Sequence, residues 1–353
     1  MSKRLGVTIP PHNSGLTTGL LSSLVRSAES LGYEAAFLPE AWSYDTTTVM
    51  MRCAMESSSI KIGSAILPIE ARTPAQTAMA AVAIDDASDG RLILGLGVGH
   101  RHKEENWHGL NYNPSVGRFR EYVEIVREIT SGKEMSYEGN YLKCTDYRLG
   151  ITPVRPTIPV YLAALGLRTH RLVGEMADGV LAYYAAPGWV EVIVNTIRQG
   201  AESAGRALED IDVCLMIPTQ VTDDPEPALE LARKQIAWYN AFENYNYMFR
   251  MAGFVEEANA LKAAWEKVRE RDPDLLEWQE EQGNDCGTAC HVSDEMVESI
   301  FVIGDEAKVA QRIDSYRSLG VTMPIVFPQG TFSDVKSAMA SYLRTMSAAS
   351  TMT

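Results

Sequence analysis

Ile60-Lys61-Ile62-Gly63-Ser64-Ala65-Ile66-Leu67 opens the stretch of sequence that decides the fold, and Leu92-Ile93-Leu94-Gly95-Leu96 closes it. Neither run alternates polar and apolar residues as a half-exposed strand does, so both are expected to be strands covered on two faces. A helix is predicted between them at residues 74–88, since Thr73 is a favourable N-cap and Pro74 suits the first helical position. Strand, helix and strand in this order form the unit of a parallel sheet.

The same alternation continues in both directions along the chain. The 353 residues give about 44 for each of eight units, more than a TIM barrel needs, so insertions are expected. An open doubly wound sheet would show the same alternation, but eight units in one chain favour the closed form. We predict an α/β fold, a (β/α)8 TIM-like barrel. Its predicted strands are residues 5–9, 35–38, 60–67, 92–96, 158–163, 180–182, 211–217 and 324–327.

The excess length is concentrated between the seventh and eighth strands, at residues 223–302. Helices are predicted there at 227–238, 239–253 and 256–271, within a single domain of residues 1–353. The insertion follows the carboxyl end of a strand, where the active sites of barrels lie. It is therefore a candidate lid or wall of the substrate pocket, and a contact between subunits is the alternative.

Composition limits the classes of function. The net charge is −14, from 32 basic and 46 acidic residues, which argues against binding to nucleic acid or anionic membranes. Five cysteines, an odd number, suggest a reducing compartment without a disulfide framework. No segment approaches the roughly 20 apolar residues that span a bilayer. We expect a cytoplasmic protein.

Two predicted strand ends are poor in side chains and rich in backbone amides. They are Gly95-Leu96-Gly97-Val98-Gly99 and Ala163-Ala164-Leu165-Gly166-Leu167. Such loops suit a ligand that approaches the backbone closely, a phosphate above all. Neither is a dinucleotide-binding fingerprint, because no G-x-G-x-x-G opens a helix, and no P-loop lysine follows.

No metal site is expected. His100, His102 and His108 stand near Glu104 and Glu105, but their spacing does not match pairs of ligands on one helix face. Cys286, Cys290 and His291 lack a second pair of ligands nearby, so free thiols are the simpler interpretation. A serine nucleophile elbow is also missing from the sequence.

A longer motif leads into the glycine-rich strand end, Asp85-Asp86-Ala87-Ser88-Asp89-Gly90-Arg91-Leu92-Ile93-Leu94-Gly95-Leu96-Gly97. It resembles the D-x-x-S-x-G-R-x-x-L-G-x-G motif of the luciferase-like monooxygenase superfamily of flavin-dependent oxidoreductases. The resemblance covers nearly the whole chain. It continues at residues 31–42, 71–76, 107–109, 159–166, 175–179 and 292–297.

The resemblance implies a TIM-like barrel, commonly a homodimer, that binds a flavin or deazaflavin at the carboxyl ends of its strands. It also implies a non-prolyl cis peptide beneath the cofactor ring, which falls here at Ala65-Ile66. Members that use FMN usually carry an A-G-x-S-type loop after the fifth strand, where the phosphate sits. Here Ala163-Ala164-Leu165-Gly166 has no serine.

This loop is more similar to the subgroup that uses the deazaflavin coenzyme F-420 and is related to methylenetetrahydromethanopterin reductase. The stretch Glu40-Ala41-Trp42 also resembles deazaflavin-dependent members. One departure is Ala41, because better understood members of the subgroup carry a histidine after the acidic residue. A proton-transfer role of that histidine must be absent here or supplied elsewhere.

The resemblance thus implies hydride transfer between C5 of coenzyme F-420 and a small organic substrate. Glu40 or His100 would act as general acid or base, with a pKa that burial moves toward neutrality. His12, Trp42 and Trp107 are expected in the substrate pocket. The alternatives are an FMN-dependent monooxygenase supplied by a separate reductase, and a non-catalytic flavin-binding barrel. The residues expected at the cofactor are Glu40, Ala65, Ile66, Gly97, Gly99, His100, Ala163, Ala164, Leu165 and Gly166.

Overall fold

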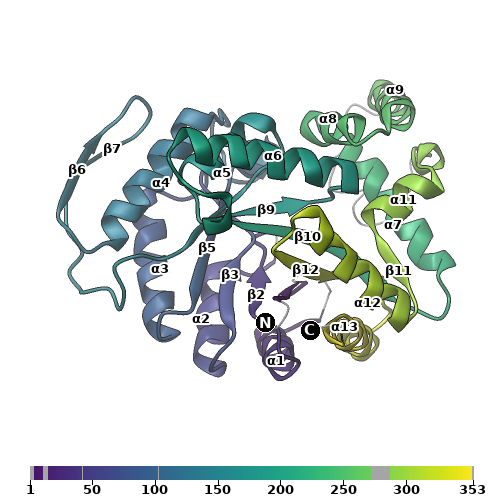
Figure 1. Ribbon diagram of the computed structural model, residues 1–353, viewed down its shortest axis with the longest axis horizontal. Helices are drawn as coiled ribbons and strands as arrows, with labels where there is room; N and C mark the ends of the chain where they lie inside the picture. Colours follow the sequence, from purple (N-terminus) through teal and green to yellow (C-terminus); the bar gives the residue numbers. More distant parts are fainter. Residues whose placement is uncertain (1–3, 11–14, 42, 102, 272–286, 352–353) are drawn as a thin grey trace.

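The computed structural model describes residues 4–10, 15–41, 43–101, 103–271 and 287–351. Its centre is a parallel barrel that closes on itself, because β12 pairs with β1 and β10 pairs with β9 (Figure 1). The predicted (β/α)8 barrel is confirmed, and an open sheet is excluded because the pairing of β9 with β10 joins the two ends of the row of eight strands. In barrel order the strands are β1 (Gly6–Thr8), β2 (Ala35–Leu38), β3 (Lys61–Ser64) continued by β4 (Leu67–Pro68), β5 (Leu92–Gly97), β8 (Val160–Ala163), β9 (Gly179–Tyr183), β10 (Asp212–Val221) and β12 (Met323–Pro328).

Helices follow the strands and cover the outside of the barrel. The predicted N-cap at Thr73 is confirmed as a capping box: its hydroxyl accepts from the Gln76 amide at 3.2 Å, and the Gln76 side chain accepts from the Thr73 amide at 3.3 Å. None of the described helices combines the length and the apolar character needed to cross a bilayer. The covering helices are α1 (Thr18–Ser30), α2 (Thr46–Glu56), α3 (Pro74–Ala87), α4 (Val116–Thr130), α5 (Leu167–Met176), α6 (Pro187–Ser203), α12 (Glu306–Ser315) and α13 (Val335–Ser350).

Glycine at position 95 allows two strands of the barrel to approach closely. A Cβ on Gly95 would stand 1.9 Å from the carbonyl oxygen of Ser64. The Ser64 hydroxyl bridges the same two strands, accepting from the Gly95 amide at 2.9 Å and donating to its carbonyl at 2.8 Å. Below this contact the interior of the barrel is packed with apolar side chains, among them Phe37, Ile93 and Met323.

A polar network closes the amino-terminal end of the barrel. The Arg4 guanidinium donates to Glu34 at 2.7 Å and to Asp212 at 2.9 Å. Asp212 also accepts from the hydroxyl of Tyr161, and Lys61 pairs with Glu34 at 2.8 Å. Because all of these residues lie at or near the beginning of a strand, the network stabilises the end opposite the expected active site.

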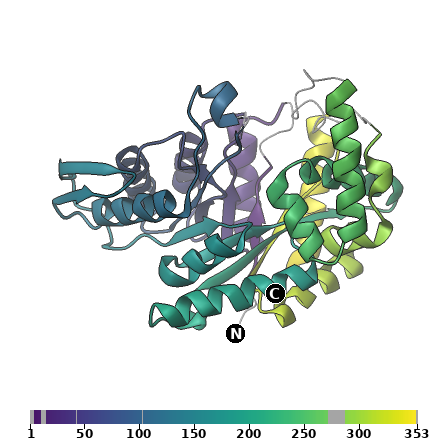
Figure 2. The same cartoon turned by 90° about the horizontal axis from the view of Figure 1, so that it is seen from above.

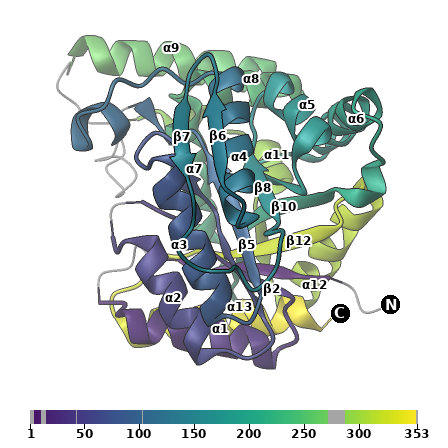
Figure 3. The same ribbon diagram turned by 90° about the vertical axis from the view of Figure 1, so that its left-hand side faces the viewer.

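A hairpin of β6 (Met135–Glu138) and β7 (Lys143–Tyr147) was not predicted. It lies over α4 (Figure 3), and its turn is held by a tertiary contact. The Glu121 carboxylate of α4 accepts from the amides of Asn140, Tyr141 and Leu142 at 2.7, 2.9 and 2.8 Å. The hairpin thus depends on a residue of another element, which a local sequence pattern does not reveal.

The insertion lies on the side of the molecule opposite the hairpin (Figures 1 and 2). It begins after β10, which extends four residues beyond the predicted end, and it leads to β11 (Val302–Gly304), which pairs with the end of β10. Trp265 donates to the Ala237 carbonyl at 2.8 Å and so joins the last of its long helices to the first. The helices are α7 (Glu226–Asn240), α8 (Glu243–Met251), α9 (Val255–Arg271) and α11 (Asp294–Ile300).

Candidate active site

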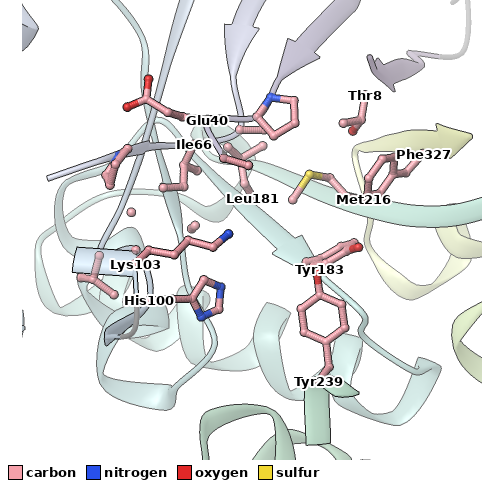
Figure 4. A pocket seen from close by; sticks show the side chains of 18 of the residues that line it. Thr8, Glu40, Ile66, His100, Lys103, Leu181, Tyr183, Met216, Tyr239 and Phe327 are labelled. Atoms are coloured by element: carbon pink, nitrogen blue, oxygen red, sulfur yellow. The ribbon is translucent and has the colours of Figure 1, made fainter. Parts of the chain in front are cut away.

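A cavity of about 1290 Å³ lies at the carboxyl ends of the barrel strands (Figure 4). It has two halves. The half over β2, β4, β5 and β8 carries charged side chains and exposed backbone, whereas the half over β9, β10, β12 and β1 is lined by aromatic and aliphatic side chains. The first half contains most of the residues predicted at the cofactor.

Backbone and small side chains form the floor of the first half. The peptide bond between Ala65 and Ile66 is cis, which confirms the expectation from the resemblance. Gly97 lies directly beside it, since a Cβ at Gly97 would stand 2.8 Å from Cγ1 of Ile66. A larger residue at position 97 would push Ile66 out of place, so the glycine keeps the floor flat.

The loop after β8 presents amides to the cavity. Gly166 is the N-cap of α5 and has no side chain to bond the first turn, and a Cβ built there would meet no atom within 4 Å. The buried His170 holds the loop from below, because its Nε2 lies 3.1 Å from the Ala164 carbonyl. Burial lowers the pKa of His170 to about 4, so the ring is neutral and its Nε2–H donates this bond. The open amides at a helix N-terminus suit an anion.

Glu40 is held by an ion pair at the end of β2. Its Oε2 lies 3.1 Å from Nη2 of Arg72, and the same nitrogen donates to Asp45 at 2.6 Å. All three side chains line the cavity. Glu40 is therefore fixed in position beside the Arg72 guanidinium, with its oxygens available as hydrogen-bond acceptors.

Glu104 is a buried carboxyl group that the sequence analysis considered only as a metal ligand. It lies on a single π-helical turn, η1 (Lys103–Trp107), lines the cavity and is 2% exposed. Its Oε2 has no hydrogen-bond partner among the described residues. Burial, and then the negative charges of Glu70 and Glu40, raise the pKa of Glu104 to about 7, against the opposing effect of Lys103. Glu104 can thus exchange a proton with a ligand near neutral pH.

His100 behaves differently from the expectation. Its ring lies 5.1 Å from that of Phe242, measured between centroids, and its side chain points into the cavity beside Lys103 (Figure 4). Burial, and then the positive charge of Lys103, lower the pKa of His100 to about 3. The predicted shift toward neutrality is wrong for this residue, because burial disfavours the charged imidazolium. A neutral His100 can donate or accept a hydrogen bond.

The structure brings together the predicted cofactor residues that it describes. Trp107, predicted in the substrate pocket, lies at the rim and is 39% exposed. His12 and Trp42 lie outside the described residues. The residues that line the cavity as predicted are Glu40, Ala65, Ile66, Gly97, Gly99, His100, Ala163, Ala164, Leu165 and Gly166.

Metal ligands do not gather in the part of the chain that the structure describes. Within it, no three histidine, cysteine, aspartate or glutamate side chains are placed to hold an ion. His102 and Cys286, two of the residues weighed as ligands, lie outside that part. Cys290 is exposed and donates to the Gly287 carbonyl.

The first helix of the insertion forms a wall of the cavity. Leu231, Gln235 and Tyr239 of α7 recur every four residues and line the cavity, together with Lys234 and Trp238. One face of a helix has this spacing. Of the two interpretations of the insertion, the geometry supports the pocket wall, and a contact between subunits stays a prediction.

A closed barrel with a flat backbone floor, an amide-rich loop and buried carboxyl groups at its strand ends has the form of a cofactor-dependent oxidoreductase. The chain belongs to the luciferase-like monooxygenase family, whose sequence profile matches residues 4–323. The resemblance inferred from the motifs is confirmed, and the protein is an oxidoreductase of this family.

Relatives and solved structures agree with this placement. The chain is 28% identical over 309 residues to the 5,10-methylenetetrahydromethanopterin reductase of Archaeoglobus fulgidus, covering 86% of this chain and 88% of the relative. The structure of the coenzyme F-420-dependent tetrahydromethanopterin reductase from Methanopyrus kandleri superimposes with a TM-score of 0.78 at 24% identity, covering 98% of both chains. A coenzyme F-420-dependent secondary alcohol dehydrogenase, solved with an F-420–acetone adduct, gives 0.74 at 16% identity over 99% of both chains. These two structures show the same fold.

Proposed function

We propose that the protein is a coenzyme F-420-dependent oxidoreductase that transfers a hydride between the deazaflavin and a small organic substrate. One observation carries the proposal: a flat floor suited to a ring and a buried carboxyl with a pKa of about 7 face the same cavity. The relative from Archaeoglobus fulgidus supports it as a reductase of the subgroup that the sequence resembles. The loop after β8 supports it as well, because it lacks the serine typical of FMN-dependent members.

The residues of the charged half fit a deazaflavin. Ala65, Ile66 and Gly97 would support the ring, since Gly97 leaves space above Ile66 that a Cβ would fill. The amides of Leu165 and Gly166, with the N-terminus of α5, would hold the phosphodiester. Coenzyme F-420, when bound, supplies a ring carbon, C5, that takes up or gives a hydride.

Side chains of the protein would take up or release the proton that accompanies hydride transfer. Hydride transfer to or from an organic substrate is accompanied by a proton, and Glu104 can hold or release it near pH 7. Glu40, fixed by Arg72 at 3.1 Å, orients a hydroxyl or ring N–H group by accepting its hydrogen bond. The neutral His100 adds a hydrogen bond without taking the proton at this pH. Glu104 and Glu40 therefore have separate roles, set by their surroundings.

The cavity has room for cofactor and substrate together. Its volume of about 1290 Å³ exceeds the range of roughly 300–1,000 Å³ that is usual for a pocket with one ligand. The chemically different halves suit two different ligands. We infer that both reactants are bound at once, so that hydride passes directly between them.

Titration of the purified protein with coenzyme F-420 and with FMN, followed by fluorescence, tests the proposal. We expect micromolar binding of F-420 and weaker binding of FMN. Binding of FMN with none of F-420 would instead indicate the monooxygenase supplied by a separate reductase. Binding of F-420 without redox turnover of the bound deazaflavin by any class of small organic substrate would indicate the non-catalytic barrel.

The homodimer and the cytoplasmic location follow from the resemblance and the composition and remain predictions. Size-exclusion chromatography with light scattering measures the mass in solution directly. A mass of twice the chain mass of 38.9 kDa is expected. A mass equal to that of one chain would refute the dimer and leave the proposed chemistry unaffected.

A further inference from the structure

The second half of the cavity has a chemical character of its own. Leu181 and Tyr183 come from β9, Met216 from β10 and Phe327 from β12, and Thr8 from β1 completes the row (Figure 4). These strands are neighbours in the barrel, so their side chains form one continuous surface. It faces the charged half, where Lys103 and His100 point into the same space. A substrate that reacts with a ring on the charged side would rest against this surface.

Aromatic side chains make this half suited to an apolar body. The ring of Tyr183 lies 5.5 Å from that of Tyr239 on α7 and 5.8 Å from that of Phe327, measured between centroids. Trp238, which is 5% exposed, also lines the cavity from α7. Contact with such rings stabilises flat or aliphatic groups by burying their surface.

The lysine and the glutamine that α7 contributes to this half are already paired. Lys234 is the single charged side chain among the described residues that line it, and its Nζ lies 2.9 Å from Glu230. Gln235 donates to Gln329 at 3.2 Å and accepts from the Tyr184 hydroxyl at 2.6 Å. A phosphate or carboxylate placed here would lose its hydration without gaining an unpaired cation. The surface therefore disfavours an anionic substrate.

Among the described residues of this half, one buried polar atom has no hydrogen-bond partner. Thr8 is 1% exposed, and its Oγ1 has no hydrogen-bond partner within the described part of the structure. Buried hydroxyl groups are nearly always bonded, so an orphaned one at a cavity wall points to a ligand oxygen. A hydroxyl group both donates and accepts. It can therefore bond a carbonyl oxygen as donor and an alcohol as acceptor, which covers both redox states of one compound.

We propose that the substrate is an uncharged alcohol or carbonyl compound with an apolar body, bound in this half with its oxygen at Thr8. The inference rests on the proposed function and specifies its substrate class. In the oxidative direction the C–H bond of the carbinol carbon would break, and its hydrogen would leave with two electrons, which the oxidised deazaflavin accepts when it is bound. The hydroxyl proton would pass to Glu104, which faces the same cavity from the charged half, and the C=O bond would form. The reductive direction is the exact reverse.

Calorimetry with chosen probes tests the substrate class. We would titrate 1-phenylethanol, acetophenone and glucose 6-phosphate into both the F-420-loaded and the cofactor-free protein. The two uncharged probes should bind at least about tenfold more tightly than the sugar phosphate. Turnover, followed by the loss of F-420 absorbance, should occur with 1-phenylethanol. Tighter binding or faster turnover of glucose 6-phosphate would overturn the inference.

Substitutions at Thr8 test the oxygen contact. Thr8→Val replaces the hydroxyl by a methyl group of similar size, and it should weaken binding of both uncharged probes by about tenfold, the effect of one lost hydrogen bond. Thr8→Ser should keep the affinity within about threefold. Thr219→Val is the matched control, since Thr219 is buried on β10 outside the cavity and donates to the Ile217 carbonyl at 2.7 Å. Equal affinities for Thr8→Val and the unsubstituted protein would overturn the contact.

The design separates this inference from the proposed function. Failure of F-420 to bind would refute the proposed cofactor, and the cofactor-free titrations would still measure the preference for uncharged probes. Normal F-420 binding by Thr8→Val, together with lost probe binding, would assign Thr8 to the substrate. If Thr8→Val also lost F-420 binding by tenfold or more, Thr8 would belong to the cofactor and the inference would be wrong.

Discussion

The carboxyl group of Glu104 lies against the α-carbon of Gly99. A Cβ on Gly99 would stand 2.3 Å from Oε1 of Glu104, and Gly99 has a φ of +69°. The glycine-rich end of β5 thus does more than leave amides free for a ligand. It makes room for a buried acid, and burial is what raises the pKa of that acid to about 7.

Replacing Gly99 should therefore lower the free energy of unfolding by more than its positive φ alone explains. Gly99→Ala adds a methyl group that must displace Glu104, besides adopting a positive φ. Gly109→Ala is the matched control, because Gly109 has a φ of +65° and its Cβ would meet no atom within 4 Å. We expect Gly109→Ala to lower the free energy of unfolding by about 1 kcal/mol, and Gly99→Ala to lower it further and weaken F-420 binding. If urea denaturation shows the same loss of unfolding free energy for Gly99→Ala and Gly109→Ala, the contact between Gly99 and Glu104 would be contradicted.

Glu104 should make stability depend on pH. In the unfolded chain a glutamate titrates near 4.3, whereas in the folded protein Glu104 keeps its proton up to pH about 7. The folded state thus binds more protons between these values, and the free energy of unfolding falls as pH rises through this window. Glu104→Gln should remove this fall, which amounts to at most about 4 kcal/mol. Urea denaturation of both proteins at pH 5 and pH 8 measures it, and the same difference between them at both pH values would refute it.

His100 should remain neutral over the working pH range. Its pKa of about 3 lies below the ordinary value of a histidine, so the folded state gains no charge there when pH falls from 7 to 5. The imidazole ¹⁵N signals of His100 should therefore stay unchanged over that range. The effect of His100 on stability has the opposite pH dependence to that of Glu104. Below pH about 6.5 the unfolded chain takes up a proton on this histidine and the folded state does not, so the free energy of unfolding falls as pH falls. A ring signal that titrates near pH 6.5 would contradict the burial of this side chain.

An acidic residue at position 166 should weaken cofactor binding without lowering the stability of the fold. Gly166→Asp places a side chain in open space and supplies an N-cap for α5, so the melting temperature should stay the same or rise. The same carboxylate would repel a phosphodiester at the loop, and F-420 affinity should fall by about tenfold or more. Gly166→Ser is the neutral control, with affinity close to that of the unsubstituted protein. Unchanged F-420 affinity in Gly166→Asp would place the phosphodiester elsewhere.

At the other end of the barrel, Arg4→Met should affect stability alone. It leaves Glu34 and Asp212 without their shared guanidinium, which donates to them at 2.7 and 2.9 Å. Because Arg4 is 35% exposed, we expect a loss of about 2 kcal/mol in the free energy of unfolding, less than for a fully buried pair. Cofactor affinity should not change. Arg198→Met on the exposed side of α6, where Arg198 bonds Asn195, serves as the control in the same denaturation measurements.

Strands covered on both faces were the most predictable part of the fold. The predicted strand at residues 35–38 coincides with β2, and the one at 92–96 falls one residue short of β5. Their apolar runs encode burial directly. The predicted strand at 60–67 is instead divided into β3 and β4 around the cis peptide, which its apolar residues do not indicate. The β6–β7 hairpin was missed because Glu121, distant in sequence, holds its turn.

The location of the candidate site could be predicted from the fold, but the pKa values of its residues could not. Closure of the barrel brings the strand ends together, so Glu40, His100 and the loop around Gly166 could be placed in one cavity from the sequence. The pKa values of His100 and Glu104 depend on how deeply the π-helical turn is buried, and the sequence carries no sign of that depth. The sequence therefore suggested Glu40 and His100 as the general acid or base and did not suggest Glu104.

The position of α7 has a consequence for protein engineering. Its cavity-facing side chains, such as Leu231, Gln235 and Tyr239, lie on one helix, while Trp265 anchors that helix from behind through the Ala237 carbonyl. A combinatorial library confined to those positions would vary the range of substrates that bind. It would leave the residues proposed to bind the cofactor and the Trp265 contact unchanged. Substrate selectivity can thus be engineered on one helix, separately from the hydride-transfer site.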